Sequence, residues 1–414
     1  MDDEVGAWLA ERAVPVDRFG LDSWAPALRG VRVLGVGTAA HGARELLEFG
    51  RRLVEYAVDE LGVRVVVIGA SEAGGTGLDA AARGVGTPGD AVGALGGWEF
   101  DTREVVELVS WLRDRNEMAD PADRVRVVGA DPVRPARSIR VLGTYLRAVA
   151  EDLLPDARDA LAELLDHEPD ERSLSPARRD AVVTLHERIV AREGELTAES
   201  SPARYAEARE HAWILARAAE VAAAPRGREP STAAEAEALS DTGRPVLRAR
   251  LAAEVVTRAA AGASGTPAVV LFGHDDLVRV GDPTTAGRHL RSALGDAYYA
   301  VGGLFSAGAV SAVRRRLLRP ARPRPSTHKV PALEGTVEAD LRAALGETDE
   351  LLVDLRGARS QDGAVADWAA ATTATRRLGS VADSGQLRAR TPLVAAREYD
   401  ALAHVPKVHP AWIR

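Results

Sequence analysis

Hydrophobic and polar positions in the first third of the chain alternate between two kinds of segment. Short runs rich in β-branched residues occupy 31–36, 64–68 and 125–128, and glycine follows each run. Such runs are typical of buried parallel strands. Between them, segments 43–61 and 103–116 place apolar side chains at helical spacing. The repeated strand–helix–strand pattern predicts an α/β fold with a mostly parallel central sheet flanked by helices.

The middle of the chain has a different pattern. Strand-like runs disappear between about 138 and 262, where Ala, Leu, Glu and Arg dominate. Segments 138–153, 176–192 and 202–224 have the spacing of amphipathic helices. These patterns predict a large all-helical insertion or subdomain.

The strand pattern returns after the helical section. Its apolar runs are at 268–272, 298–301, 311–315 and 351–355. We therefore expect a first α/β half at 1–137, a helical insertion at 138–262 and a second α/β half at 263–414.

Composition narrows the class of protein. The 414 residues suit two domains, or one α/β domain with a large insertion. A net charge of −8 argues against a nucleic-acid partner. No cysteine is present, so disulfides and thiolate chemistry are excluded. The chain begins without a signal-like segment and has no apolar run of membrane-spanning length, so we expect a cytoplasmic protein with no membrane partner.

Polar and aromatic side chains follow several predicted strands. Ligands in open parallel sheets bind beyond the carboxyl ends of the strands, so these positions are the candidates for a site. The candidates are Thr38, His41, Glu45, Ser71, Glu72, Asp131, His274, Asp275 and Asp276, with Trp98 and Phe100 as aromatic residues that line the pocket or pack in the core.

His41 and His274 are the strongest candidates because each follows a buried strand and histidine titrates near neutral pH. We expect the two imidazoles to face one pocket. Glu45 lies one helical turn beyond His41 and could turn back to it as a catalytic partner. Ser71 and Asp131 have an alternative interpretation as helix-cap or turn residues.

A metal site is a weaker hypothesis. Glu72, His274, Asp275 and Asp276 have suitable ligand chemistry, but the adjacent aspartates also fit a cap on the next helix. The sequence contains no His-Glu-x-x-His pair, no nucleophile elbow and no phosphate-binding loop. We therefore expect neither a metal nor an organic cofactor.

Several stretches together resemble the erythromycin-esterase family. GTAAHGARE, which starts at Gly37, is similar to the family's opening pattern Gly-Glu-x-Thr-His-Gly followed by Glu. Segments 96–116, 125–132, 268–279 and 398–408 resemble the family's Trp-rich stretch, its Gly-x-Asp strand end, its Ala-His-Asn-x-His region and its ending. The resemblance implies hydrolysis of macrolide lactones, with His41 as general base on a water molecule and no metal or acyl-enzyme.

The departures from the family pattern affect the catalytic set. Thr38 and Gly69 stand where the family has glutamates, and Leu277 stands where it has a second histidine. In the helical motif before the later histidine, Arg248 and Glu254 match. Each lost acid–base partner typically lowers a rate by about 10²–10⁴-fold.

Three functions fit this pattern. The first is a tailoring enzyme of secondary metabolism, in which His41 transfers a proton on a mid-sized apolar natural product, as in cyclisation or elimination. The second is a carboxylic-ester hydrolase, and the third is an inactive ligand-binding homologue. In each case the partner is a small molecule held between the carboxyl edge of the sheet and the helical subdomain. The sequence leaves the substrate and the oligomeric state open.

Overall fold

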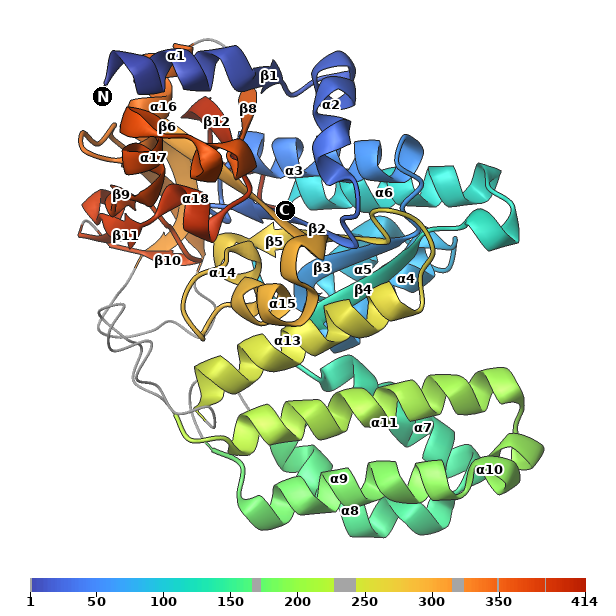
Figure 1. The fold of residues 1–414 in the computed structure, drawn as a ribbon. Coiled ribbons are helices and arrows are strands. Elements are labelled where there is room, and N and C mark those ends of the chain that lie inside the picture. Colours follow the sequence, from blue (N-terminus) through green and yellow to red (C-terminus); the bar gives the residue numbers. More distant parts are fainter. Residues whose placement is uncertain (1, 166–172, 227–242, 315–323, 348–349, 384) are drawn as a thin grey trace.

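A ten-stranded sheet runs through the centre of the computed structural model, which describes residues 2–165, 173–226, 243–314, 324–347, 350–383 and 385–414. The strand order is β1-β8-β12-β6-β2-β5-β3-β4, and β7 and β10 pair with β6. The six strands from β12 to β4 are mutually parallel, whereas β8 and β1 are antiparallel additions at one edge. The predicted α/β class with a mostly parallel sheet is confirmed (Figure 1).

The strands have these bounds: β1 Ala13–Pro15, β2 Val33–Thr38, β3 Val65–Ser71, β4 Arg126–Asp131, β5 Val269–His274, β6 Tyr298–Arg314, β7 Pro325–Val330, β8 Leu351–Asp354, β10 Val381–Ala382 and β12 Ala401–Val408. A separate two-stranded sheet joins β9 Thr373–Thr375 to β11 Thr391–Leu393. The runs predicted at 298–301 and 311–315 belong to one long strand, β6. Strand β12 was not predicted, because His404 and Pro406 interrupt its apolar run.

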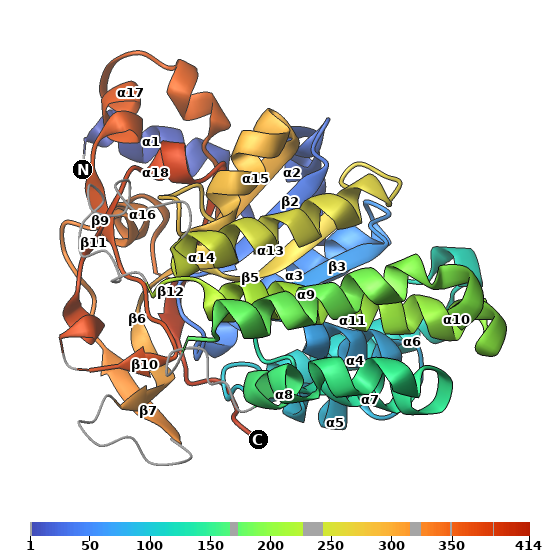
Figure 2. The same cartoon turned by 90° about the horizontal axis from the view of Figure 1, so that it is seen from below.

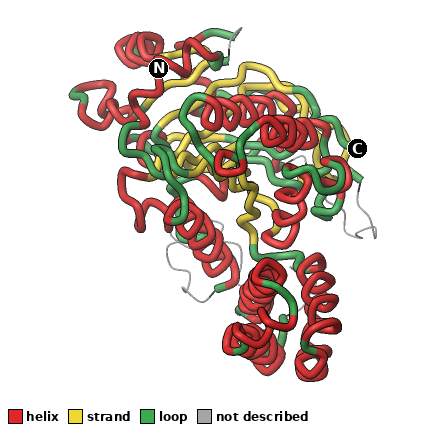
Figure 3. Tube along the Cα trace, turned by 90° about the vertical axis from the view of Figure 1, so that its right-hand side faces the viewer, coloured by secondary structure: helices red, strands yellow, loops and turns green. Residues whose placement is uncertain are grey.

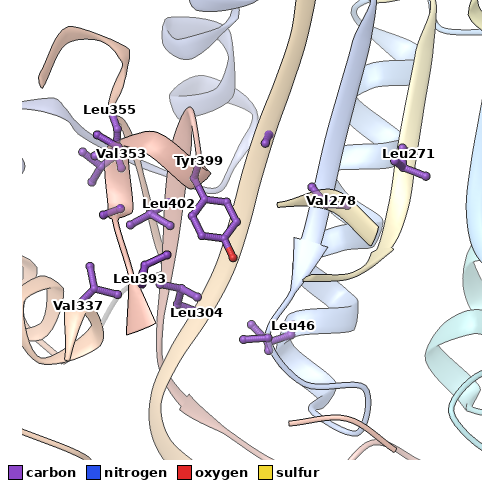
Figure 4. Packing of buried hydrophobic residues seen from close by; sticks show 14 of the residues in the cluster. Leu46, Leu271, Val278, Leu304, Val337, Val353, Leu355, Leu393, Tyr399 and Leu402 are labelled. Carbon is purple, nitrogen blue, oxygen red and sulfur yellow. The ribbon is translucent and has the colours of Figure 1, made fainter. Parts of the chain in front are cut away.

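Successive residues of the central strands point to opposite faces of the sheet. Val33 and Leu271 belong to the core on one face, while Leu34 and Phe272 belong to the core on the other. Figure 4 shows packing in the first of these cores, where Leu271 and Val278 lie near the β2–β5 pair. This double burial explains the continuous apolar runs in the sequence.

Helices cover both faces. The first core receives side chains from α1 Asp3–Arg12, α13 Arg244–Ala261, α15 Ala286–Leu294, α16 Val337–Leu345 and α17 Gly363–Ala370. The second receives them from α2 Arg18–Trp24, α3 Arg44–Asp59, α4 Glu72–Ala82, α5 Pro88–Gly93 and α6 Arg103–Met118. Two short helices, α14 Asp275–Val278 and α18 Ala395–Glu398, complete the second half of the chain.

The helical section forms a lobe beside the sheet (Figures 1 and 3). Its helices are α7 Ala136–Val149, α8 Leu154–Leu165, α9 Pro176–Ala191, α10 Glu193–Glu199 and α11 Pro202–Ala223, and they share a hydrophobic core of their own. Helix α13 differs, because Ala252, Ala253 and Val256 are buried in the core of the sheet. Residues 166–172 and 227–242 of the predicted insertion lie outside the described residues.

Helix α13 lies between the helical lobe and the sheet, as the view from below also shows (Figure 2). It contacts α11 on one side and β3, β4 and β5 on the other. None of the described helices combines the length and apolarity needed to cross a bilayer.

Strand β6 extends beyond the carboxyl end of β2 and supports the loop that follows β2. The Ser311 amide donates to the Gly42 carbonyl at 2.9 Å. A Cβ atom on residue 42 would collide with the carbonyl group of Ser311. Glycine after His41 is therefore required by this close approach of two backbones.

Two buried histidines make stability depend on pH. His211 bonds to the Ser138 hydroxyl at 2.8 Å, and His404 bonds to the Ser306 hydroxyl at 2.9 Å. Burial, with help from Arg137 and Arg342 respectively, lowers the pKa of each histidine to about 4. Both rings are therefore neutral in the folded protein at pH values where the unfolded chain already binds protons.

We expect the free energy of unfolding to be fully maintained above pH 6.5 and to fall as the pH drops from 6.5 towards 4. The loss between pH 7 and 5 is on the order of 1–2 kcal/mol per histidine. Denaturant melts at pH 7 and pH 5 measure it. In His404→Gln the loss over this interval should be smaller than in the wild type, and an unchanged loss would contradict a buried neutral His404.

Candidate functional site

Two imidazole rings stack at the carboxyl edge of the sheet. His41 lies in the loop after β2, and His274 is the last residue of the neighbouring strand β5. Thr38 pairs in register with His274, so the loop after β2 carries His41 directly over the end of β5. The ring centroids are 4.3 Å apart and the planes are inclined by 19°. The structure thus brings together the two histidines that the sequence singled out.

His274 has a different partner on each ring nitrogen. Its Nε2 lies 3.3 Å from the Leu378 carbonyl oxygen. Its Nδ1 lies 3.3 Å from both the backbone nitrogen and the Oδ2 carboxylate oxygen of Asp276. A neutral ring accepts from the Asp276 amide and caps α14, whereas a protonated ring donates to the Asp276 carboxylate. His274 can therefore gain or lose a proton without losing its position.

His41 is held by its backbone rather than by hydrogen bonds on its ring. The Leu378 amide donates to the Ala39 carbonyl at 2.8 Å, and Ala40 forms a parallel bridge with Leu378. The edge of the Phe100 ring packs on the imidazole, with centroids 6.4 Å apart. No hydrogen bond joins the imidazole to another residue in the described part of the chain, and the ring keeps partial exposure to solvent. Its nitrogens are thus free to meet a substrate.

The two rings differ in their affinity for protons. Burial, followed by the charge of His274, holds the pKa of His41 well below its usual value. Burial also opposes the charge on His274, but Asp276, Asp275 and the Leu378 carbonyl together raise its pKa above the usual value. At neutral pH a neutral imidazole therefore lies against a ring that favours the charged form, which is the arrangement of a base beside an acid.

Glu45 does not serve His41, contrary to the sequence-based expectation. Its two carboxylate oxygens accept from the backbone amide of His409 at 2.6 Å and from the His409 ring at 2.7 Å. Glu45 lies in the first turn of α3, where the tail of the chain passes. The i,i+4 spacing applies within a helix, and His41 lies before the helix begins.

Asp275 lies inside the protein and does not face a substrate. It is fully buried, accepts from Arg377 Nε at 3.0 Å and from the Tyr399 hydroxyl, and so anchors α14 directly behind His274. Glu398 joins this network by accepting from both Arg377 and Arg279. The expected role of Asp275 as a substrate-binding residue is therefore replaced by a structural one. Asp276 is the aspartate that faces His274, and its side chain is 61% exposed.

The remaining predicted residues are spread along the same edge of the sheet. Ser71 caps α4 by accepting from the Gly74 amide, which agrees with its alternative interpretation. Thr38 is buried and its hydroxyl lies 3.4 Å from the Gly273 carbonyl. Asp131 forms a two-point ion pair with Arg248. Trp98 is half-buried, and the aromatic ring that meets His41 is that of Phe100.

Glu72 takes part in a buried ion pair that sequence reasoning missed. Arg217 Nε lies 3.1 and 3.2 Å from the two oxygens of Glu72, and both side chains are less than a tenth exposed. Arg217 also binds Glu254 and the Leu251 carbonyl, and it stacks on Trp213. Burial raises the pKa of Glu72 to about 8, while the Arg217 charge opposes that rise. The pair joins the lobe to the end of β3.

Three arginines at the site had no distinctive sequence signal. Arg217 and Arg248 lie in helices where arginine is frequent, and Arg377 follows a strand of three residues. Only their burial and partners mark them. Within the described residues, no group of three or more His, Asp or Glu side chains could hold a metal ion.

The sequence matches one known protein family over most of its length. A family profile described as Erythromycin esterase matches residues 58–408. The chain belongs to the erythromycin esterase family. Membership supports a hydrolase-type function of the esterase class. The matched region begins after the His41 motif, where the sequence departs from the family pattern.

Solved structures share the fold at low sequence identity. A succinoglycan biosynthesis protein has 17% identity and a TM-score of 0.78, with 100% of this chain and 98% of that chain covered. A Bacillus cereus protein has 17% identity and a TM-score of 0.76, with 100% and 99% covered. A mutant of the erythromycin esterase EreC in its open conformation has 15% identity and a TM-score of 0.66, with 96% and 98% covered. A search of curated proteins found no match.

Breaking the Glu72–Arg217 pair should destabilise the fold. Arg217→Met leaves a buried carboxylate without its cation, and we expect it to lower the free energy of unfolding by about 3–5 kcal/mol. Denaturant unfolding measures the change. Arg192→Met is the control, because Arg192 forms exposed ion pairs with Asp152 and Glu195 and should have little effect. Adding Glu72→Gln to Arg217→Met should recover part of the loss; equal stability of Arg217→Met and wild type would contradict a stabilising role for the pair.

Proposed function

We propose that this member of the erythromycin esterase family is an acid–base enzyme in which His41 removes a proton and His274 stabilises the charge that forms. The substrate is a mid-sized, largely apolar natural product such as a polyketide or macrolide-like compound. The observation that carries the proposal is the stacked pair, with centroids 4.3 Å apart and opposite preferences for the proton.

The favoured reaction is proton transfer within the substrate, as in cyclisation or elimination. His41 takes a proton from a carbon or hydroxyl next to a carbonyl group, and the cationic His274 stabilises the developing oxyanion. The proton on His41 then passes to the leaving group or to the new product. Such a reaction needs a base and a cation but no activated water.

The surroundings of His41 favour this reaction over hydrolysis. A base that activates water usually has a carboxylate to orient it and to stabilise its charged form. Thr38 stands where the family has a glutamate, and Glu45 is bound to His409. No carboxylate among the described residues hydrogen-bonds to His41.

Ester hydrolysis is the second candidate, because membership of an esterase family favours it. In that reaction His41 takes a proton from water, the resulting oxygen attacks the ester carbonyl carbon, and the bond to the leaving alcohol breaks. His274 again stabilises the oxyanion, and His41 returns the proton to the departing alkoxide.

The reaction should show a pH profile with two limbs. The rate should fall at acid pH, well below 6.5, as His41 becomes protonated, and it should fall again as the pH rises past the raised pKa of His274. His41→Ala should lower kcat/KM by at least about 10²-fold, and His274→Gln should remove the alkaline limb. Initial rates across pH 4–9 on the best substrate of a macrolactone panel measure both effects. A His41→Ala variant with full activity would refute the proposal.

Product mass distinguishes the two reactions. Hydrolysis adds the mass of one water to the substrate, whereas cyclisation leaves the mass unchanged and elimination lowers it by the leaving group. We expect no gain of water with the wild type when products are separated by liquid chromatography and weighed by mass spectrometry. A gain of water that His41→Ala abolishes would select hydrolysis instead, and tight binding without any product would identify a ligand-binding protein.

A further inference from the structure

Residues 409–414 cross two loops that meet at His41. The His409 carbonyl accepts from the Arg44 amide at 2.9 Å, while the amide and ring of His409 bind Glu45. These contacts fix the start of α3, three residues beyond His41. The segment continues from β12, which is already held in the sheet by β6 and β8.

Ala411 reaches the loop of His41 itself. The Ala411 amide donates to the Gly42 carbonyl at 2.9 Å, and the Ser311 hydroxyl donates to the Ala411 carbonyl at 3.3 Å. Gly42 directly follows His41, and its carbonyl also accepts from the Ser311 amide. Its carbonyl oxygen is thus held from two sides, by β6 and by the tail.

Trp412 then connects α3 to α6. Its ring lies between the guanidinium groups of Arg44 and Arg103, each 4.9 Å from the ring centroid. Its amide donates to the buried carboxylate of Glu104 at 3.1 Å, and its carbonyl accepts from the Arg103 amide at 2.9 Å. The side chain of Trp412 is about half exposed, so its burial alone does not explain these contacts.

The last two residues bind the loop that carries Phe100. Ile413 forms an antiparallel bridge with Thr102, and the Arg414 amide donates to the Asp101 carbonyl at 3.1 Å. Phe100 directly precedes Asp101 and packs its ring edge on His41. One short segment therefore holds both the backbone beside His41 and the aromatic ring that shields it.

We propose that residues 409–414 are a positioning segment for His41: they fix its loop and the Phe100 ring together. This inference rests on the proposed function, because it assigns the segment to the same base. The sheet and its two cores form without the segment, since β12 ends at Val408 and supplies the buried side chains. Loss of the segment should therefore impair His41 more than it impairs folding.

The test uses Trp412→Ala in the full chain, with Trp412→Phe as the conservative variant. The first reports are the imidazole resonances of His41 in NMR spectra, assigned by their loss in His41→Ala. In Trp412→Ala we expect shifted His41 signals and a titration midpoint closer to that of an exposed histidine, because Phe100 no longer shields the ring. Trp412→Phe should restore the wild-type signals, while Phe19→Ala, an exposed aromatic far along the chain, should leave them unchanged.

Activity and stability complete the test. We expect kcat to fall by about 10–100-fold in Trp412→Ala, with KM and the melting temperature changed much less. A chain ending at Val408 should behave similarly, and circular dichroism reports whether it folds. Unchanged His41 signals in Trp412→Ala would overturn the inference, as would a melting temperature that falls in step with activity. Full activity of His41→Ala would refute the proposed function alone, because the NMR signals of Trp412→Ala do not depend on turnover.

Discussion

The parallel pairing of β2 with β5 is the constraint on which the site depends. It sets Thr38 opposite His274, so that the loop after β2 crosses the end of β5 and carries His41 onto the second imidazole. Parallel strands end at the same edge of a sheet, and neighbouring strands are only about 5 Å apart. Two residues separated by more than two hundred positions in the chain are thereby brought into ring contact.

Arginines then fix the parts around this contact. Arg377 holds Asp275 behind His274, and the next residue, Leu378, bonds to both His274 and the loop of His41. Arg217 joins the helical lobe to the end of β3 through Glu72. Because these charges are buried and paired, losing one partner would leave the other uncompensated. The site is thus rigid in its surroundings, while the ring of His41 remains free of hydrogen bonds within the described residues.

The family resemblance and the local geometry bear on different questions. Membership of the erythromycin esterase family supports a hydrolase-type function, and the solved neighbours at 15–17% identity show the shared fold. The reaction depends on what surrounds His41, where Thr38 replaces a glutamate and Glu45 serves the tail. A family fold can keep its base and change the groups that direct it.

The sequence by itself determined the alternation of strands and helices, the helical section and the importance of His41 and His274. Those features are local: a buried parallel strand needs a continuous apolar run, an amphipathic helix needs a 3.6-residue repeat, and strand ends mark the ligand edge. Only the tertiary structure decided which carboxylates serve the histidines. Glu45 binds the tail, Asp275 faces inwards and Asp276 faces His274, because these contacts join segments far apart in the chain and no local spacing encodes them.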